Sequence, residues 1–100
     1  MIFEYMKAMR NAKDIASETA GIMKALAHPA RVRLLRRLMD DECCVSEVEA
    51  CLHLSQPNVS QHLRVLKNAG IIAGTRRKTR ICYRIADDRV RGILKLMAKG

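Results

Sequence analysis

The sequence predicts a mainly α-helical domain with one β-hairpin, an α+β fold whose elements follow the order α-α-α-α-β-β-α. Three observations lead to this prediction. Apolar residues recur at helical spacing through most of the chain, whereas residues 71–85 contain two short runs rich in β-branched side chains. Aromatic residues make up only 3% of the chain, so the core must be built from aliphatic side chains and Met, which suit helices better than sheets. A length of 100 residues predicts a single domain over residues 1–100.

The first two helices are expected between residues 2 and 39. Helical spacing of apolar side chains extends from about residue 2 to residue 24. His28-Pro29 interrupts this pattern, and Pro29 suits the first turn of a second helix, with His28 making a local hydrogen bond. The expected apolar faces are Ile2, Met6, Met9, Ile15, Thr19, Ile22 and Met23 in the first helix and Val32, Leu34, Leu35, Leu38 and Met39 in the second.

Two short helices joined by a tight polar turn are predicted next. Ser46 with Glu49 three residues later matches a capping box, which predicts a helix that begins at Ser46. Ser55 is a second N-cap candidate, and Pro57 fits the first turn of the helix that follows. That helix should end at Asn68-Ala69-Gly70. The expected inner faces are Val48, Cys51 and Leu52 in the first of the pair and Val59, Leu63 and Leu66 in the second.

A hairpin and a last helix complete the chain. Residues 71–76 and 80–85 are the expected strands, separated by Arg77-Lys78-Thr79, which gives the hairpin a cationic tip. Asp87 is positioned to cap the last helix. The apolar stripe of that helix, Val90, Ile93, Leu94 and Met97, serves either packing within the monomer or docking of another surface, or both.

The charge balance indicates a polyanionic partner. Lys and Arg total 19 against 10 Asp and Glu, a formal charge of +9, and the isoelectric point is near 10.0. Nucleic acid is the first candidate, and a merely solubilising basic surface is the alternative. No apolar run approaches a membrane span, and the N-terminus does not resemble a signal peptide, so we expect a cytoplasmic protein.

A pair of capped helices followed by a cationic hairpin is typical of a winged helix-turn-helix that binds duplex DNA. Polar side chains at the start of the second helix of the pair are candidates for base or phosphate contacts: Ser55, Gln56, Asn58, Ser60, Gln61 and Arg64. The hairpin would act as the wing and hold the DNA backbone through Arg76, Arg77, Lys78 and Arg80. A solvated helix face and a solubilising turn are the alternatives. An enzyme is not expected, because the chain has no Gly-rich phosphate loop and no paired metal-ligand motif.

Three stretches of the chain resemble the ArsR/SmtB family of winged-helix repressors: MKALAHPAR at residues 23–31, LSQPNVSQHLRVL at residues 54–66 and AGII at residues 69–72. The resemblance extends from about residue 15 to the end. It implies a homodimer built from the first and last helices and a palindromic DNA operator with one recognition helix per half-site. It also implies repression by the unliganded protein and release of the DNA when an inducer binds.

The cysteines are the candidate sensing groups. Cytoplasmic cysteines are expected to be thiols, metal ligands or redox groups rather than structural disulfides. The resemblance places Cys44 on the first Cys of the family's arsenical-sensing stretch, while Ser46 replaces the second and Cys43 replaces a Leu. We expect Cys43 and Cys44, near a helix N-terminus that stabilises thiolates, to bind As(III) or another thiophilic metal ion as inducer. Cys51 is an additional candidate ligand, although it and Cys82 also fit packing positions.

Two alternatives to a metal(loid)-responsive repressor stay open at this point. One is a repressor of the same fold that responds to thiol oxidation or sulfide. The other is a constitutive DNA-binding protein with inert cysteines. The zinc site that the family places on its last helix is not expected, because residues 87–95 contain no His. No cofactor is expected to be needed for DNA binding itself.

Overall fold

The computed structural model describes residues 2–98, with side chains described for all of these except residues 7–13 and Cys51. Five helices and three strands lie within this part of the chain. The elements are α1 (Ile2–Leu26), α2 (Pro29–Asp40), β1 (Cys43–Cys44), α3 (Val45–Leu52), α4 (Gln56–Asn68), β2 (Ile72–Arg77), β3 (Arg80–Ile85) and α5 (Asp88–Ala98). The predicted winged helix-turn-helix is therefore confirmed, with one strand, β1, that the sequence did not predict.

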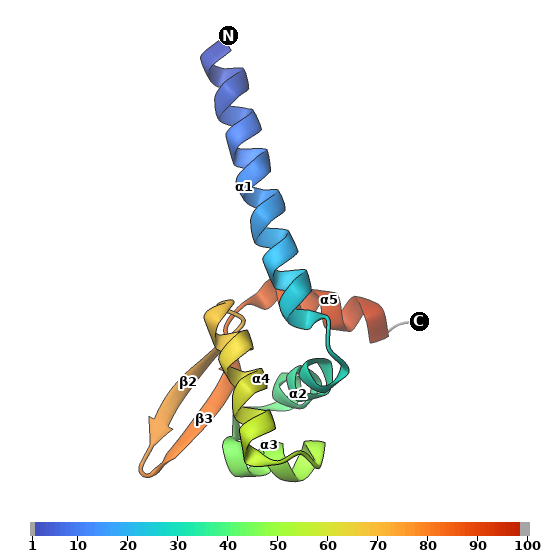
Figure 1. Cartoon of the computed structure of the whole chain (residues 1–100), viewed down its shortest axis with the longest axis vertical. Coiled ribbons are helices and arrows are strands. Elements are labelled where there is room, and N and C mark those ends of the chain that lie inside the picture. Colours follow the sequence, from blue (N-terminus) through green and yellow to red (C-terminus); the bar gives the residue numbers. More distant parts are fainter. Residues whose placement is uncertain (1, 99–100) are drawn as a thin grey trace.

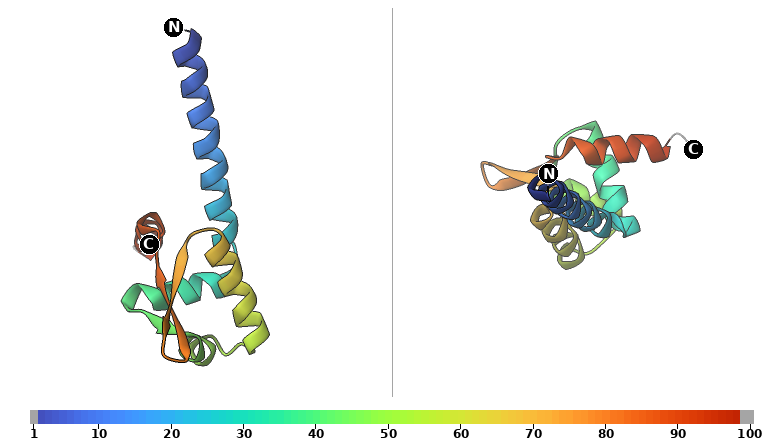
Figure 2. Two further views of the ribbon diagram at one scale, coloured as in Figure 1. Left: turned by 90° about the vertical axis from the view of Figure 1, so that its left-hand side faces the viewer. Right: turned by 90° about the horizontal axis from the view of Figure 1, so that it is seen from above.

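The long helix α1 projects away from the rest of the molecule (Figures 1 and 2). Only its C-terminal part enters the core, through Ile22 and Ala25. Large apolar side chains along the projecting part are exposed: Ile2, Phe3, Tyr5, Met6 and Ile15. The predicted apolar face of this helix is thus mostly uncovered in a single chain, while Met9 lies outside the described side chains.

Helices α2, α3 and α4 surround the core below α1 (Figure 1). Leu34, Leu35 and Leu38 of α2 are at most 1% exposed and pack among the apolar residues of the other elements. The inner face predicted for α4 is confirmed, since Val59, Leu63 and Leu66 are all buried. An aliphatic core of this kind holds the two helices of the helix-turn-helix against a rigid support.

The ends of the helices follow local chain chemistry. His28 caps α2 by accepting a hydrogen bond from the Ala30 backbone N–H at its Nδ1, 3.1 Å away, and Pro29 opens the helix as predicted. Gly70, with φ +75°, ends α4, and the Ile71 N–H bonds to the Leu66 carbonyl in the Schellman pattern. Asp87 accepts from the Arg89 backbone N–H and thus caps α5.

The predicted capping box at Ser46 is wrong. Helix α3 begins one residue earlier, at Val45, with Cys44 at the N-cap position and no side-chain capping bond. The chain enters α3 directly from a strand, so Cys44 is held in extended backbone by pairing with β3 and Ser46 falls inside the first turn. Ser55 does occupy the N-cap of α4, although its side chain makes no capping bond there.

The sheet has three strands in the order β1-β3-β2, all antiparallel. Strands β2 and β3 form the hairpin, with Arg77 opposite Arg80 and a two-residue turn between them. Strand β1 adds only two residues, pairing Cys43 with Tyr83 and Cys44 with Cys82. The sheet therefore joins the entrance of the helix-turn-helix to the base of the hairpin.

Helix α5 closes the fold beside the base of α1 (Figure 2). Val90 and Leu94 are buried, whereas Leu96 and Met97 are more than 70% exposed. Arg89 in its first turn contacts Glu18 of α1 at 2.9 Å. The apolar stripe predicted for this helix thus contributes to the core at its N-terminal end and is open at its C-terminal end. No helix in the described part of the chain is long and apolar enough to cross a membrane.

Candidate DNA-binding surface and cysteine pair

Helix α4 presents its polar side chains to solvent along one face. The buried positions recur at i, i+4 and i+7, so the residues between them must point outward. Every residue that the sequence assigned to base or phosphate contacts on this helix is exposed: Ser55, Gln56, Asn58, Ser60, Gln61 and Arg64. Their amide, hydroxyl and guanidinium groups are those that bind base edges and phosphates in a major groove.

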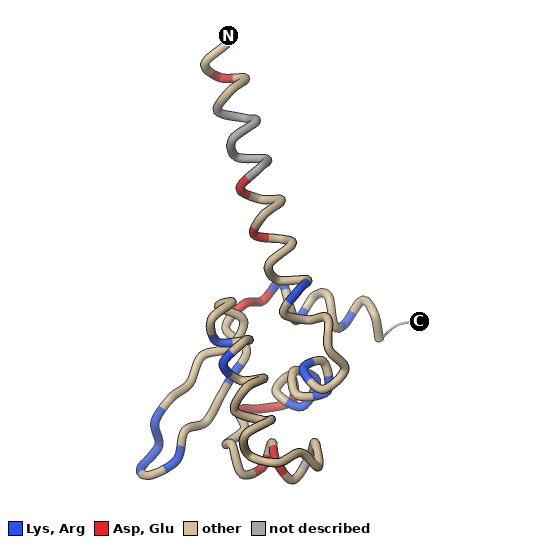
Figure 3. The backbone as a smooth tube through the Cα atoms, viewed as in Figure 1, with Lys and Arg blue, Asp and Glu red and all other residues tan. Residues whose placement is uncertain are grey.

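The hairpin places its cationic tip on the same side of the molecule as the start of α4 (Figures 1 and 2). Figure 3 shows basic residues at the tip and along α4. The predicted wing residues Arg76, Arg77, Lys78 and Arg80 are all exposed. Helix and hairpin together therefore form one cationic surface suited to the DNA backbone beside a groove.

Arg77 already has a partner in this structure. Its Nε and one terminal nitrogen donate to the two carboxylate oxygens of Glu42, at 3.1 and 2.9 Å. Hydrogen bonding to Glu42, followed by its charge, raises the pKa of Arg77. Glu42 lies just before β1, so the ion pair links the start of that strand to the wing. To hold DNA as predicted, Arg77 must give up its contact with Glu42 and bind a phosphate instead.

His62 connects α4 to the start of α2. Its Nδ1 accepts a hydrogen bond from Arg31 Nε at 3.2 Å, and its ring lies 4.5 Å from that of His28. Burial lowers the pKa of His62 from 6.5, and electrostatic interactions with His28 and Arg31 lower it further. His62 is thus half-buried and links α4 to α2, rather than facing outward with the residues predicted to contact DNA.

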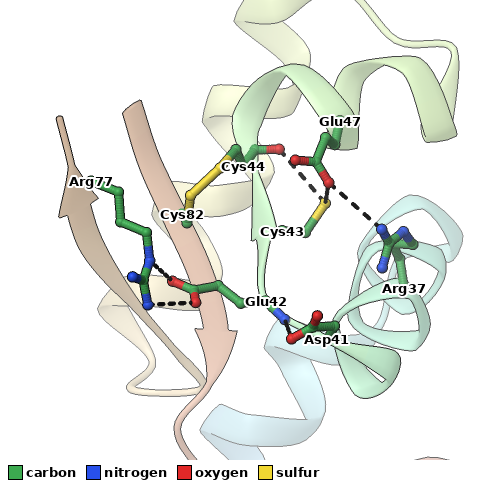
Figure 4. The surroundings of a disulfide bond; sticks show 8 residues. All are labelled: Arg37, Asp41, Glu42, Cys43, Cys44, Glu47, Arg77 and Cys82. Carbon is green, nitrogen blue, oxygen red and sulfur yellow. Dashed lines mark hydrogen bonds and ion pairs between the residues drawn. A yellow bond between two sulfur atoms is a disulfide. The ribbon is translucent and has the colours of Figure 1, made fainter. Parts of the chain in front are cut away.

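Cys44 and Cys82 form a disulfide between β1 and β3 (Figure 4). The two residues are directly opposite in the strand register, with Cα atoms 3.9 Å apart. Cys82 is 4% exposed, and Cys44 is partly exposed at the N-cap of α3. The bond therefore joins the first helix of the helix-turn-helix to the wing covalently.

Cys43 lies on the opposite face of β1 from Cys44, because side chains alternate along a strand. It is 1% exposed, and its thiol lies 3.7 Å from the carboxylate of Glu47, which in turn contacts Arg37 at 3.6 Å. The structure thus brings Cys44 to Cys82 and turns Cys43 away from both. Cys51, the additional candidate ligand, has a side chain outside the described part of the chain.

Cys82 is a functional candidate for which the sequence favoured a packing role. It does pack, but it is also the partner of Cys44. The signal in the sequence is weak: Cys82 alternates with Ile81 and Tyr83 on a predicted strand, but its neighbour across the sheet depends on a two-residue strand with no periodicity of its own.

Metal-ligating side chains do not gather elsewhere in the described part of the molecule. No group of three or more His, Cys, Asp or Glu residues there is arranged to hold a metal ion. Once reduced, Cys44 and Cys82 would offer two facing thiolates, which suit a thiophilic ion as a bidentate pair.

Comparison with known proteins finds relatives that are transcriptional regulators. The family model described as "Bacterial regulatory protein, arsR family" matches residues 28–73. The "HTH-type transcriptional repressor SmtB" of Mycobacterium tuberculosis is 39% identical over 75% of the chain, which spans 56% of that protein. The "Biofilm growth-associated repressor" of Agrobacterium fabrum is 42% identical over 82% of the chain and 70% of its own length. These relatives are transcriptional regulators and not enzymes.

Solved structures agree with this result. Reduced HlyU from Vibrio cholerae superposes with a TM-score of 0.83 at 26% identity, covering 90% of this chain and 95% of that one. The solution structure of a domain of Mb0332 from Mycobacterium bovis, described as a homodimeric winged helix-turn-helix DNA-binding domain, has a TM-score of 0.80 at 28% identity. That match covers 87% of this chain and 81% of the other.

Proposed function

Because the chain belongs to the arsR family of bacterial regulatory proteins, we propose that it is a transcriptional repressor that binds operator DNA and is controlled by the oxidation state of Cys44 and Cys82. The α4 face and the hairpin would contact the DNA. The Cys44–Cys82 pair would set the position of the α4 face relative to the hairpin.

The observation that carries this proposal is the disulfide itself. It connects the N-terminus of α3, the helix that precedes α4 in the helix-turn-helix, with β3 of the hairpin. In the cytoplasm, where we expect this chain, disulfides are rare and usually transient and redox-sensing. A disulfide at this junction is therefore better suited to control than to permanent reinforcement.

We assign DNA binding to the reduced form and release to the disulfide form. The unliganded, repressing state implied by the family resemblance corresponds to the reduced pair. In the oxidised structure the chain segment before β1 is pinned to β3, and Glu42 on that segment occupies Arg77 of the wing. Reduction removes the covalent part of this constraint, so that Glu42 can separate from Arg77 and Arg77 can turn to a phosphate.

The test compares the two redox forms on one DNA. The reduced protein selects duplexes from a random library, and fluorescence anisotropy then gives Kd for reduced and oxidised protein at one fixed salt concentration. We expect the oxidised form to bind at least about tenfold more weakly, in the range of ordinary coupling between sites. Cys82→Ser should bind equally in both conditions, while Cys43→Ser should keep the response. Equal affinities of the two wild-type forms would contradict redox control and support a constitutive DNA-binding protein.

We further propose that the chain works as a homodimer through the exposed apolar faces of α1 and α5. Burial of apolar surface is the main driving force for association, and these faces are uncovered in one chain. Sedimentation should show a dimer for the wild type and a monomer for a Leu96→Glu, Met97→Glu variant. Lys95→Glu, on the same helix and exposed, is the control that should stay dimeric. A wild-type monomer at all concentrations would refute this assignment.

A thiophilic ion such as As(III) is the second candidate inducer, and the pairing of Cys44 with Cys82 favours it specifically. Two facing thiolates on neighbouring strands form a chelate without rearrangement of the backbone, unlike Cys43 and Cys44, whose side chains diverge. The same anisotropy assay, under reductant with added arsenite, should show release that Cys82→Ser abolishes. Release that depends on Cys43 and Cys44 but not on Cys82 would restore the pair predicted from the sequence.

A further inference from the structure

His28 and His62 meet where α1, α2 and α4 come together. His28 precedes α2, and His62 lies on a half-buried side of α4, with the two rings 4.5 Å apart. Arg31 of α2 connects His62 to α1. Its Nε donates to His62 Nδ1 at 3.2 Å, and a terminal nitrogen donates to the Ala25 carbonyl at 3.1 Å. The junction therefore ties the recognition helix to both helices that precede the helix-turn-helix.

Both histidines use Nδ1 as a hydrogen-bond acceptor. His28 Nδ1 accepts from the Ala30 backbone N–H, and His62 Nδ1 accepts from Arg31. A histidine that accepts at Nδ1 is neutral and carries its proton on Nε2. In a protonated histidine both ring nitrogens are donors. Protonation of His62 would thus set a donor against the donor of Arg31 and a positive charge against its guanidinium.

The groups that face His62 are cationic or become cationic in acid. Arg31 comes from α2 and His28 from the turn before it, while Lys24 of α1 lines a small pocket together with Arg31 and Val65 of α4. None of these groups forms an ion pair with a carboxylate among the side chains that the structure describes. Burial, followed by electrostatic interactions with His28 and Arg31, keeps the pKa of His62 below 6.5.

The other elements that pack against α4 are α3 and β2, and their charged groups lie elsewhere. Glu49 of α3 lines a groove between α4 and the hairpin together with Arg64. Arg64 is two positions from His62, and residues at that spacing do not share a side of a helix. The charged residues of β2, Arg76 and Arg77, lie at the end of that strand next to the hairpin turn. The protonation state of His62 therefore depends mainly on the junction with α1 and α2.

Resting on the proposed DNA-binding function, we propose that the Arg31–His62 hydrogen bond positions α4 for operator DNA and that acid breaks it. His62 is a positioning residue, because it is half-buried and would act on DNA only through the placement of its helix. Base contacts require side chains that supporting hydrogen bonds hold within a narrow range of positions. When His62 is protonated, apolar packing alone joins this side of α4 to α2, and the base-reading side chains lose their alignment.

A charge effect and a positioning effect of His62 would have opposite signs. If protonated His62 acted only through its charge, acid would strengthen binding to every duplex, because an added cation attracts phosphate. If protonation releases α4, acid weakens the contacts to base edges, which carry the preference for one sequence over another. Loss of preference for the operator over unrelated DNA is therefore the mark of the positioning role.

The test follows this preference between about pH 5 and pH 8. Fluorescence anisotropy gives Kd for the selected operator and for an unrelated duplex, with reduced protein at one salt concentration, and their ratio measures the preference. NMR of the imidazole groups follows the protonation of His62 over the same range. We expect the preference to fall at least about tenfold as His62 is protonated, with a midpoint that coincides with the NMR titration and lies below pH 6.5.

Three variants separate the acceptor from the rest of the side chain. His62→Asn places an amide oxygen near the position of Nδ1, accepts from Arg31 at every pH and should keep the full preference throughout. His62→Leu has a similar shape but no acceptor, and should show a low preference at every pH. His53→Gln removes an exposed histidine at the end of α3 and is the control that should keep the wild-type profile. Circular dichroism at each pH checks that the proteins are folded.

Several results would overturn the positioning role while leaving DNA binding intact. One is a wild-type preference that stays constant while NMR shows His62 becoming protonated, and another is no protonation of His62 above about pH 5. A His62→Asn profile that falls like that of the wild type, or a His62→Leu preference equal to the wild type at pH 8, would also contradict it. If reduced wild type prefers no duplex at pH 8, the proposed function itself is refuted.

Discussion

Reduction of the Cys44–Cys82 bond should lower the stability of the protein by a predictable amount. The bond closes a loop with a sequence separation of 38 residues, which contains α3, α4 and β2 entirely. A cross-link stabilises the folded state mainly by restricting the unfolded chain, and for 38 residues the loop-entropy relation gives about 4 kcal/mol at 25 °C. Because small domains have total stabilities of roughly 5–15 kcal/mol, this difference is a large share of the whole.

Urea unfolding followed by far-UV circular dichroism measures this difference directly. Oxidised and reduced wild-type protein are compared at one protein concentration, because dimerisation makes apparent stability concentration-dependent. We expect the free energy of unfolding of the oxidised form to exceed that of the reduced form by about 4 kcal/mol. Cys82→Ala should match the reduced form and should not respond to reductant.

The reasoning would fail if the two wild-type forms differed by less than about 1 kcal/mol, since the closed loop would then impose no constraint on the unfolded state. A reductant effect that persists in Cys82→Ala would show that a different cysteine is responsible. Cys43→Ala separates these cases, because it removes the neighbouring thiol while the bond stays in place.

Three further predictions concern single residues. Glu42→Gln should release Arg77, tighten binding to non-specific DNA and steepen the dependence of log K on log salt by about 0.9, whereas the control Asp41→Asn should leave the salt slope unchanged; equal slopes in wild type and Glu42→Gln would contradict it. His53 ends α3 with φ 55°, so His53→Gly should raise the free energy of unfolding by about 0.5 kcal/mol in urea melts, and a loss of stability would refute the inferred strain. Because burial lowers the pKa of His62 below 6.5, the unfolded chain takes up this proton first; stability is full above pH 6.5 and falls as the pH drops from there to the folded-state pKa. His62→Gln should lessen this loss in melts between pH 5 and 8, and an unchanged profile would exclude His62 as its source.

The sequence predicts well those parts of the fold that depend on local pattern. Val59 and Leu63 are buried where helical periodicity places them, and the exposed polar face of α4 follows from the same spacing. Gly70 ends α4 because only a residue that readily adopts positive φ fits there. The α4 residues proposed to contact DNA are exposed because helical spacing places them opposite the buried face.

The cysteine pair depends on a contact that local pattern does not encode. Strand β1 has two residues, too few for any periodicity, and it exists because β3 offers it a partner more than thirty residues later in the chain. The same pairing displaces the start of α3 from the Ser46 capping box to Val45. Once β1 is recognised, the register alone brings Cys44 opposite Cys82.

The order β1-β3-β2 has a consequence for how free molecules meet one another. It leaves β2 as an edge strand, with backbone groups on its outer side that a strand from another copy would be able to pair with. Arg76 and Arg77 lie on that edge and Lys78 follows at the turn, so two wings that approach edge to edge repel each other. The side chains assigned to hold DNA thus also keep the sheets of separate molecules from joining into aggregates. When bound DNA neutralises these charges, the DNA backbone covers the wing and shields the edge of β2 in their place.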